Sequence, residues 1–125
     1  DGVLMGLLLV EMVAAYDAPL DELVNQLLAE VGPSYYARND LRLSHPVSKS
    51  KMVDRLRSHA PAVIGGHRML RVNEVDGVKY IFDDDSWLLI RPSGTEPVLR
   101  VYAEAREPQM VEALLAHGRQ VADAG

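Results

Sequence analysis

Two short apolar runs on either side of a polar loop constrain the fold of this chain more than any other feature. The runs are Trp87–Ile90 and Val98–Ala103, and Pro, Ser and Gly lie between them. Their aromatic, β-branched and aliphatic residues predict two β-strands joined by a compact connection. Pro92 fixes its own φ and biases Arg91 toward an extended backbone, whereas Gly94 allows angles that turn successive N–H groups into one concavity. We therefore predict a strand–loop–strand unit that attracts an anion.

The side chains of this loop favour the same kind of ligand. Arg91 carries a planar fork of donors that can meet two phosphate oxygens at once, and Ser93 and Thr95 add hydroxyl groups beside the backbone of Gly94. One phosphoryl group would satisfy all of them. A plain turn with a solvated Arg91 is the alternative, because Pro, Ser and Gly occur in loops of every kind.

The run Arg91–Pro97, continued by Arg100–Ala105, resembles the phosphate-contacting motif in the last domain of the α-D-phosphohexomutases, the family that includes phosphoglucomutases and phosphomannomutases. In that family the loop grips the phosphate at the end of the sugar away from the reacting position. The resemblance therefore implies substrate-phosphate contacts for four residues of this chain: Arg91, Ser93, Gly94 and Thr95.

The same resemblance implies a reaction, in which a hexose 1-phosphate and a hexose 6-phosphate are interconverted through a bisphosphorylated sugar. In the family, the phosphorylated serine, the magnesium-binding aspartates and the sugar-recognition loop belong to earlier domains, and none of their motifs is present here. We therefore expect no catalytic residue and no metal ligand in this chain. Mg²⁺ and the hexose bisphosphate are implied for the full-length enzyme, and the fragment alone is expected to be inactive.

Charge and cysteine content narrow the choice of partners. The formal net charge of −5 argues against bulk attraction to nucleic acid or an anionic membrane, so we expect neither as a partner and favour a phosphosugar held by local geometry. The chain has no cysteine, which is compatible with a reducing cytosol. The family resemblance likewise implies a cytoplasmic protein.

The first 31 residues predict two helices. Val3–Val13 is almost wholly apolar but falls short of the roughly 20 residues of a bilayer span, and Asp1 resembles a helix N-cap rather than the positive start of a signal peptide. A helix that is apolar nearly all round is normally buried, so we expect it to pack against something outside this chain. Pro19–Val31 predicts the second helix, with acidic residues in its first turn.

In the phosphohexomutases a comparable helix pair, opening with Asp-Gly as Asp1-Gly2 does here, closes the third domain. The resemblance thus implies that residues 1–32 are the helical end of domain 3 and that residues 33–125 are the C-terminal domain 4. The preceding domains of the same enzyme are then the expected partners. Without them, residues 1–31 are expected to be poorly ordered or to self-associate through their apolar face.

The remaining elements predict an α+β domain. Tyr35–Leu43 suits an edge or irregular strand, and Ser48 is a plausible N-cap for a helix to about Ser58. Met69–Val75 and Val78–Phe82 are separated by Asp76-Gly77, a two-residue hairpin signal. A final helix covers about Pro108–Ala122, in which Gly118 costs about 1 kcal/mol against Ala. We predict a mainly antiparallel four-stranded sheet with helices on one face, in agreement with the TATA-binding-protein-like last domain of the family.

Three other groups of residues have both a functional and a structural interpretation. Asp83, Asp84 and Asp85 could form a hard-cation site, although a solvated turn is the simpler interpretation. The basic residues of the helix after Ser48 could meet RNA phosphates or form a solvated face. The histidines lack the spacing of a zinc motif and are expected to be surface or partly packed residues, although His45 and His67 could line a cleft. The four histidines are His45, His59, His67 and His117.

One hypothesis from a different class stays open. The same loop could belong to a free-standing phosphate-binding or phosphoprotein-binding module without catalysis. The apolar run Val3–Val13 disfavours this alternative, because a self-sufficient module would supply its own partner for that surface.

Overall fold

The computed structural model describes residues 1–43, 48–94 and 96–123. The chain divides into two compact units, Asp1–Pro33 and Ser34–Gly125, which we describe separately. His45 and Thr95, which entered the sequence interpretation, lie outside the described residues. The assignment of residues 1–32 to a preceding domain stays a prediction.

The first unit contains two helices, α1 (Gly2–Tyr16) and α2 (Leu20–Val31). The predicted N-cap is confirmed, since the Asp1 carboxylate accepts a hydrogen bond from Val3 N at 2.9 Å. No residue of α1 is buried. Among the described residues, no single helix has the length and apolar content of a membrane span. Only α1 and α2 taken together reach both criteria, and the pair bends by 84° at its break.

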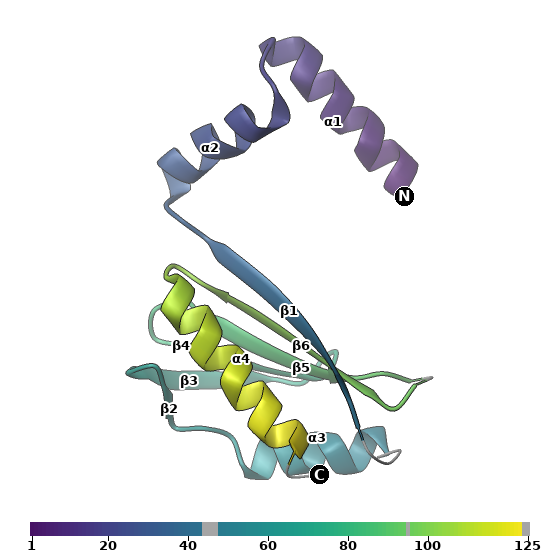
Figure 1. Ribbon diagram of the computed structural model, residues 1–125, viewed down its shortest axis with the longest axis vertical. Helices are drawn as coiled ribbons and strands as arrows, with labels where there is room; N and C mark the ends of the chain where they lie inside the picture. The colour runs from purple at the N-terminus through teal and green to yellow at the C-terminus, as the bar shows by residue number, and fades with distance from the viewer. Residues whose placement is uncertain (44–47, 95, 124–125) are drawn as a thin grey trace. The chain divides into compact units, whose positions relative to one another are not determined.

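The second unit is a six-stranded sheet with two helices (Figure 1). Its strands are β1 (Tyr35–Arg42), β2 (Val63–Ile64), β3 (His67–Asn73), β4 (Val78–Phe82), β5 (Trp87–Pro92) and β6 (Val98–Ala105). The helices are α3 (Lys49–Ser58) and α4 (Pro108–Asp123). The strand order is β1-β6-β5-β4-β3-β2, and every neighbouring pair is antiparallel.

The prediction of a four-stranded sheet is therefore wrong, whereas the α+β class and the antiparallel pairing are confirmed. One cause is β2, a two-residue strand that pairs with the start of β3 across Gly65-Gly66. Both glycines have positive φ, 58° and 88°, the conformation that a two-residue hairpin turn requires. The sequence carried this Gly-Gly signal, but the apolar run before it is too short to be recognised as a strand.

One face of the sheet forms the core. No helix of this unit that the structure describes covers the other face, which we call the open face. Buried and less buried residues alternate along β4, β5 and β6, as the two-residue period of a strand requires. Tyr80 of β4 lies on the core side and contacts both helices: its hydroxyl donates to Leu56 O of α3 at 2.7 Å, and its ring packs edge-on against His117 of α4. Both helices therefore cover the same face, and Figure 1 shows α4 lying across the strands.

The contact of α4 with β6 corrects the interpretation of Gly118. A Cβ at this buried position would lie 2.5 Å from Val101 Cγ1, so the helix approaches the sheet this closely only because residue 118 has no side chain. The cost in intrinsic helix propensity that the sequence predicted is the smaller effect at this site.

The β3–β4 hairpin is confirmed, but its turn is longer than predicted. β3 ends at Asn73 and β4 begins at Val78, so four residues rather than two connect the strands. Gly77 adopts a φ of +92°, and a Cβ there would lie 2.6 Å from Ile90 O of β5. The turn therefore rests against the neighbouring strand, close to Arg91.

Candidate functional site

Strand β5 places Arg91 at the start of the predicted anion-binding loop and on the open face of the sheet. Ile90 and Pro92 on either side of it are buried, so its own side chain points away from the core. Arg91 pairs in register with Arg100 of β6, and the two guanidinium-bearing side chains therefore share one face. Arg91 keeps 42% of its side chain exposed, which leaves it accessible to a ligand.

Pro92 ends the strand without loss of a hydrogen bond in the sheet. The β4–β5 ladder stops at Ile90, whereas the β5–β6 pairing continues beyond Pro92. Along a strand, the backbone N–H and C=O groups of successive residues point alternately to the two neighbouring strands. Ser93 N donates to Val98 O of β6 at 2.8 Å, so the nitrogen of Pro92 points toward β4, where the β4–β5 ladder has already ended. The missing N–H of proline is tolerated here for that reason.

The loop differs from the concavity of free N–H groups that the sequence predicts. Its first amide, Ser93 N, closes the β5–β6 hairpin, and Val98 N bonds Glu96 O at 2.7 Å. A phosphate contact from Ser93 would therefore use its hydroxyl rather than its N–H. Thr95 lies outside the described residues, so its predicted contact stays a prediction.

Gly94 is exposed, and its φ is not in the left-handed region. A Cβ at this position would meet nothing within 4 Å. Residue 94 therefore leaves its backbone accessible, and the phosphate contact predicted for it stays a prediction.

Arg100 is a candidate that the sequence interpretation missed. It lies opposite Arg91 on β6, and its Nε is buried without a hydrogen-bond partner among the described residues. On its other side, β1 places Asp40 in register with it. Arg38 holds the Asp40 carboxylate with two hydrogen bonds of 2.7 and 2.6 Å and lowers its pKa. The alternation of core and open residues along β6 could have placed Arg100 on the open face, but only the register places it beside Arg91.

Arg91 forms an ion pair with Asp76 of the β3–β4 turn. Asp76 Oδ1 lies 3.0 Å from Arg91 Nε. The remaining guanidinium nitrogens, Nη1 and Nη2, can still donate to two oxygens of one phosphate. The sequence identified Asp76 only as a turn residue.

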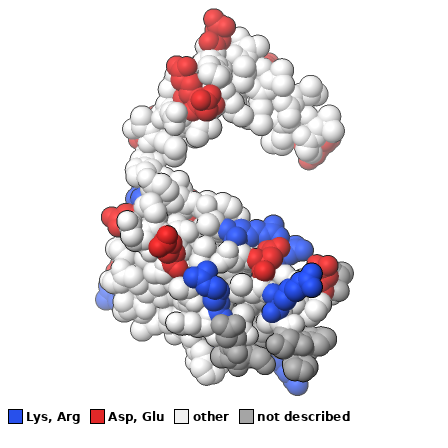
Figure 2. All heavy atoms as spheres, viewed as in Figure 1, with Lys and Arg blue, Asp and Glu red and all other residues white. Residues whose placement is uncertain are grey.

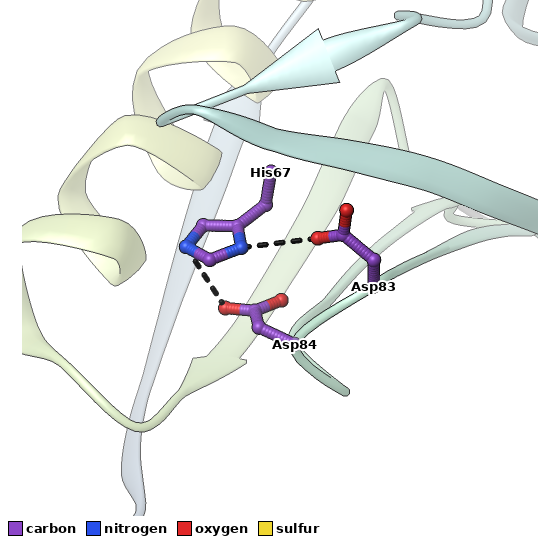
Figure 3. Close-up of side chains that lie close together, drawn as sticks. All are labelled: His67, Asp83 and Asp84. Atoms are coloured by element: carbon purple, nitrogen blue, oxygen red, sulfur yellow. Dashed lines mark hydrogen bonds and ion pairs between the residues drawn. The ribbon is translucent and has the colours of Figure 1, made fainter.

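A second cluster lies at the other end of β5, before its first residue (Figure 3). His67 Nδ1 is 3.0 Å from Asp83 Oδ1, and His67 Nε2 is 3.6 Å from Asp84 Oδ2. Desolvation is the largest single influence on the Asp83 carboxyl and would raise its pKa. The hydrogen bond with His67, the backbone hydrogen bond with Arg68 and the charges of these two residues together outweigh it, so this pKa lies below its ordinary value. Asp84 is half-buried and accepts hydrogen bonds from the backbone and hydroxyl of Ser86. The predicted solvated turn is thus wrong for Asp84.

These three side chains are also of the types that bind metal ions, with potential ligand atoms within 4.8 Å of one another. However, the two ring nitrogens of His67 face different carboxylates, whereas an imidazole offers a metal ion only one nitrogen at a time. We therefore interpret the cluster as a histidine that bridges two carboxylates.

The basic helix α3 has at least one internal partner. Arg57 is paired with Glu74 of the β3–β4 turn through two charge-assisted hydrogen bonds, which lower the pKa of the Glu74 carboxyl. His59 contacts groups at the end of the same helix, Ser58 Oγ and Arg55 O. These contacts favour the structural interpretation of this face over an RNA-binding one. In the view of Figure 2, basic side chains of the second unit lie among acidic ones.

Comparison of the chain with known proteins identifies its family. An α+β domain with an Arg-Pro-Ser-Gly loop between two central strands matches the family model described as "Phosphoglucomutase/phosphomannomutase, C-terminal domain" over residues 46–119. The chain belongs to this family, as the sequence resemblance predicted.

Several relatives are phosphoglucosamine mutases. Those of Methanococcus maripaludis strain C5 and Methanococcus aeolicus are 33% and 35% identical to this chain, each over 94% of it and over 24% of the relative. A probable phosphoglucosamine mutase of Pyrococcus horikoshii is 32% identical over 92% of this chain and 23% of its own length. The chain thus spans about a quarter of the length of these relatives.

Proposed function

We propose that this chain binds the phosphate group of a hexose phosphate through the β5–β6 loop, as the C-terminal domain of a phosphohexomutase. The observation that supports this most is the position of Arg91: an exposed guanidinium at the strand end that opens the loop, on the open face and beside Arg100. Two arginines on one face favour a dianion, because each can contribute charge-assisted hydrogen bonds. Ser93, Gly94 and Thr95 complete the proposed site.

We further propose a hexosamine phosphate as the sugar, interconverted between its 1-phosphate and 6-phosphate through a bisphosphate. The support is the identity of the relatives, which are named phosphoglucosamine mutases over nearly the whole of this chain. Glucose and mannose phosphates are the alternatives. The loop reads a phosphate rather than a sugar hydroxyl, so the other domains would decide among these substrates.

In this proposal the phosphoryl-carrying group, Mg²⁺ and the contacts to the sugar ring belong to preceding domains of the enzyme. This chain contributes a fixed anion site that can hold either phosphate of the bisphosphate as the sugar turns over. The 125-residue chain alone is therefore expected to show no mutase turnover on glucosamine, glucose or mannose phosphate, and activity of a contaminant-free preparation would contradict this assignment.

The second candidate is a phosphate-binding or phosphoprotein-binding module without catalysis. It uses the same loop, and the accessibility of Arg91 is compatible with it. The exposure of α1 favours the enzyme instead, since Val3 is 75% exposed and Leu7 63%, and apolar surfaces of this kind are normally covered in a working protein.

Substitution of Arg91 by lysine tests the proposal in the enzyme that contains this chain. Lysine keeps the charge but loses the fork, so Arg91→Lys should lower kcat/KM by roughly ten- to a hundredfold, equivalent to a charge-assisted contact of about 1.5–3 kcal/mol. The melting temperature should shift by only a few degrees, because the ion pair of Arg91 with Asp76 is solvent-exposed.

The matched control is Arg71→Lys, an exposed arginine of β3 on the same open face but away from the loop. It should leave kcat/KM unchanged. A normal kcat/KM in Arg91→Lys would remove Arg91 from the site, whereas a collapsed melting temperature would give this residue a structural role.

A further inference from the structure

The contact between Arg91 and the β3–β4 turn joins two parts of the chain that are 15 positions apart. Asp76 Oδ1 lies 3.0 Å from Arg91 Nε, with 56% and 42% of the two side chains exposed. An exposed ion pair of this kind contributes little to the stability of the fold. The ion pair can nevertheless influence which conformations the Arg91 side chain adopts.

Gly77 is what lets the turn come so close. A Cβ at residue 77 would lie 2.6 Å from Ile90 O and 3.1 Å from Arg91 Cα, and the φ of +92° is one that other residues rarely adopt. The backbone of the turn therefore rests directly on the strand that carries Arg91. The close contact fixes the position from which the Asp76 carboxylate reaches Nε.

The atom that Asp76 contacts decides what remains for a ligand. Nε lies on the inner side of the guanidinium, so one carboxylate oxygen there restricts the terminal torsions of the side chain and leaves Nη1 and Nη2 available. An unrestrained arginine would lose several rotamers when it binds an anion, and Asp76 reduces that loss before the ligand arrives.

We propose that Asp76 is a positioning residue for Arg91, a role that rests on the proposed phosphate binding by the loop. The Asp76 carboxylate forms an ion pair with the guanidinium at Nε and leaves Nη1 and Nη2 to face the phosphate, and Gly77 provides the close approach. The carboxylate also repels the bound anion, but both groups are solvent-exposed, and screening by water and salt weakens this repulsion. In this proposal the ordering of Arg91 outweighs the repulsion, and the affinity of Asp76→Ala for phosphate tests this.

The test is a titration of the 125-residue chain with inorganic phosphate, followed by the amide signals of Ser93 and Gly94 and by the Nε–Hε signal of Arg91 in ¹⁵N NMR spectra. Asp76→Ala should weaken phosphate binding by about three- to tenfold, the order of the cost of immobilising one flexible side chain. Asp76→Asn keeps an oxygen acceptor for Nε, so its affinity should stay within about twofold of wild type.

The matched control is Glu74→Ala, which removes an acidic residue of the same turn that pairs with Arg57 rather than Arg91. It should leave phosphate affinity unchanged, which separates positioning from a general effect of charge. The Nε–Hε signal should shift in Asp76→Ala before phosphate is added. A melting curve followed by Trp87 fluorescence should stay within a few degrees of wild type.

Equal or tighter phosphate binding by Asp76→Ala would overturn the positioning role while leaving phosphate binding by the loop intact, since tighter binding would make Asp76 a competitor for the guanidinium. Loss of affinity in Glu74→Ala equal to that in Asp76→Ala would also overturn it. If phosphate perturbs neither Ser93 nor Gly94 in the wild-type chain, both the proposed function and the role of Asp76 fail.

Discussion

The hydroxyl of Tyr80 provides a stability test of the way α3 is held on the sheet. Tyr80 is fully buried on β4, and its hydroxyl donates to Leu56 O at 2.7 Å. Leu56 lies in the last turn of α3, where backbone carbonyls have no partner within the helix. Tyr80→Phe keeps the ring in the core but leaves this carbonyl without its donor. The substitution should lower the free energy of unfolding by roughly 1–3 kcal/mol at pH 7.

The pH dependence of the unfolding free energy gives a second measure of how deeply the Tyr80 hydroxyl is buried. Burial raises the pKa of Tyr80 to about 12 from 10.0. Between these values the unfolded chain loses the phenolic proton and the folded chain keeps it, so wild-type stability should fall as the pH rises from 10 toward 12. Two pKa units correspond to an upper bound of about 2.7 kcal/mol. Tyr80→Phe lacks this group, so the difference between the two proteins should shrink across that range.

Urea denaturation followed by the fluorescence of Trp87, the single tryptophan, measures both effects. Tyr36→Phe is the matched control, because Tyr36 is 58% exposed on β1 and its loss of a hydroxyl should change stability little. An unfolding free energy of Tyr80→Phe within about 0.3 kcal/mol of wild type at pH 7 would refute the capping of Leu56. If the difference in unfolding free energy between wild type and Tyr80→Phe stays constant up to pH 12, burial does not raise the pKa of Tyr80.

Three other predictions follow from packing and burial. Gly118→Ala should destabilise the chain by about 1–3 kcal/mol, because its Cβ would lie 2.5 Å from Val101 Cγ1; an unchanged urea midpoint would contradict this. Burial lowers the pKa of His117, so the unfolded state binds a proton first and stability should fall as the pH drops below about 6.5, a loss that His117→Gln should remove. The exposed apolar face of residues 1–31 should drive self-association at high concentration, and Leu7→Glu should reduce it in sedimentation velocity experiments; a wild-type chain that stays monomeric would refute this prediction.

Much of the fold could be predicted because its signals are local. Asp1 and Ser48 begin helices with the side-chain hydrogen bonds that their position predicts. The apolar runs of β4, β5 and β6 have the composition of strands, and the family resemblance of the loop after Arg91 is confirmed by the match over residues 46–119. The contacts of the loop with a phosphate remain predictions.

The errors concern features whose signal is short or depends on neighbours. The predicted count of four was one short of the five strand-like runs in the sequence. The sixth strand, β2, was missed because it has only two residues and depends on pairing with β3. The cost assigned to Gly118 was incomplete because helix propensity ignores what packs against a helix, and here Val101 fills the space of the missing side chain. The predicted concavity of successive loop N–H groups does not include that of Ser93, which continues the strand pairing into the loop.

The sequence by itself determined which chemical groups are present and where along the chain they occur: an Arg-Pro-Ser-Gly loop between two strands, an apolar first helix and a protein without cysteine. Only the tertiary structure decided which distant groups meet. Strand register places Arg100 beside Arg91, and the β3–β4 turn places Asp76 at its Nε. Such contacts depend on the alignment of strands and turns that are far apart in sequence, and no local pattern of residues specifies that alignment.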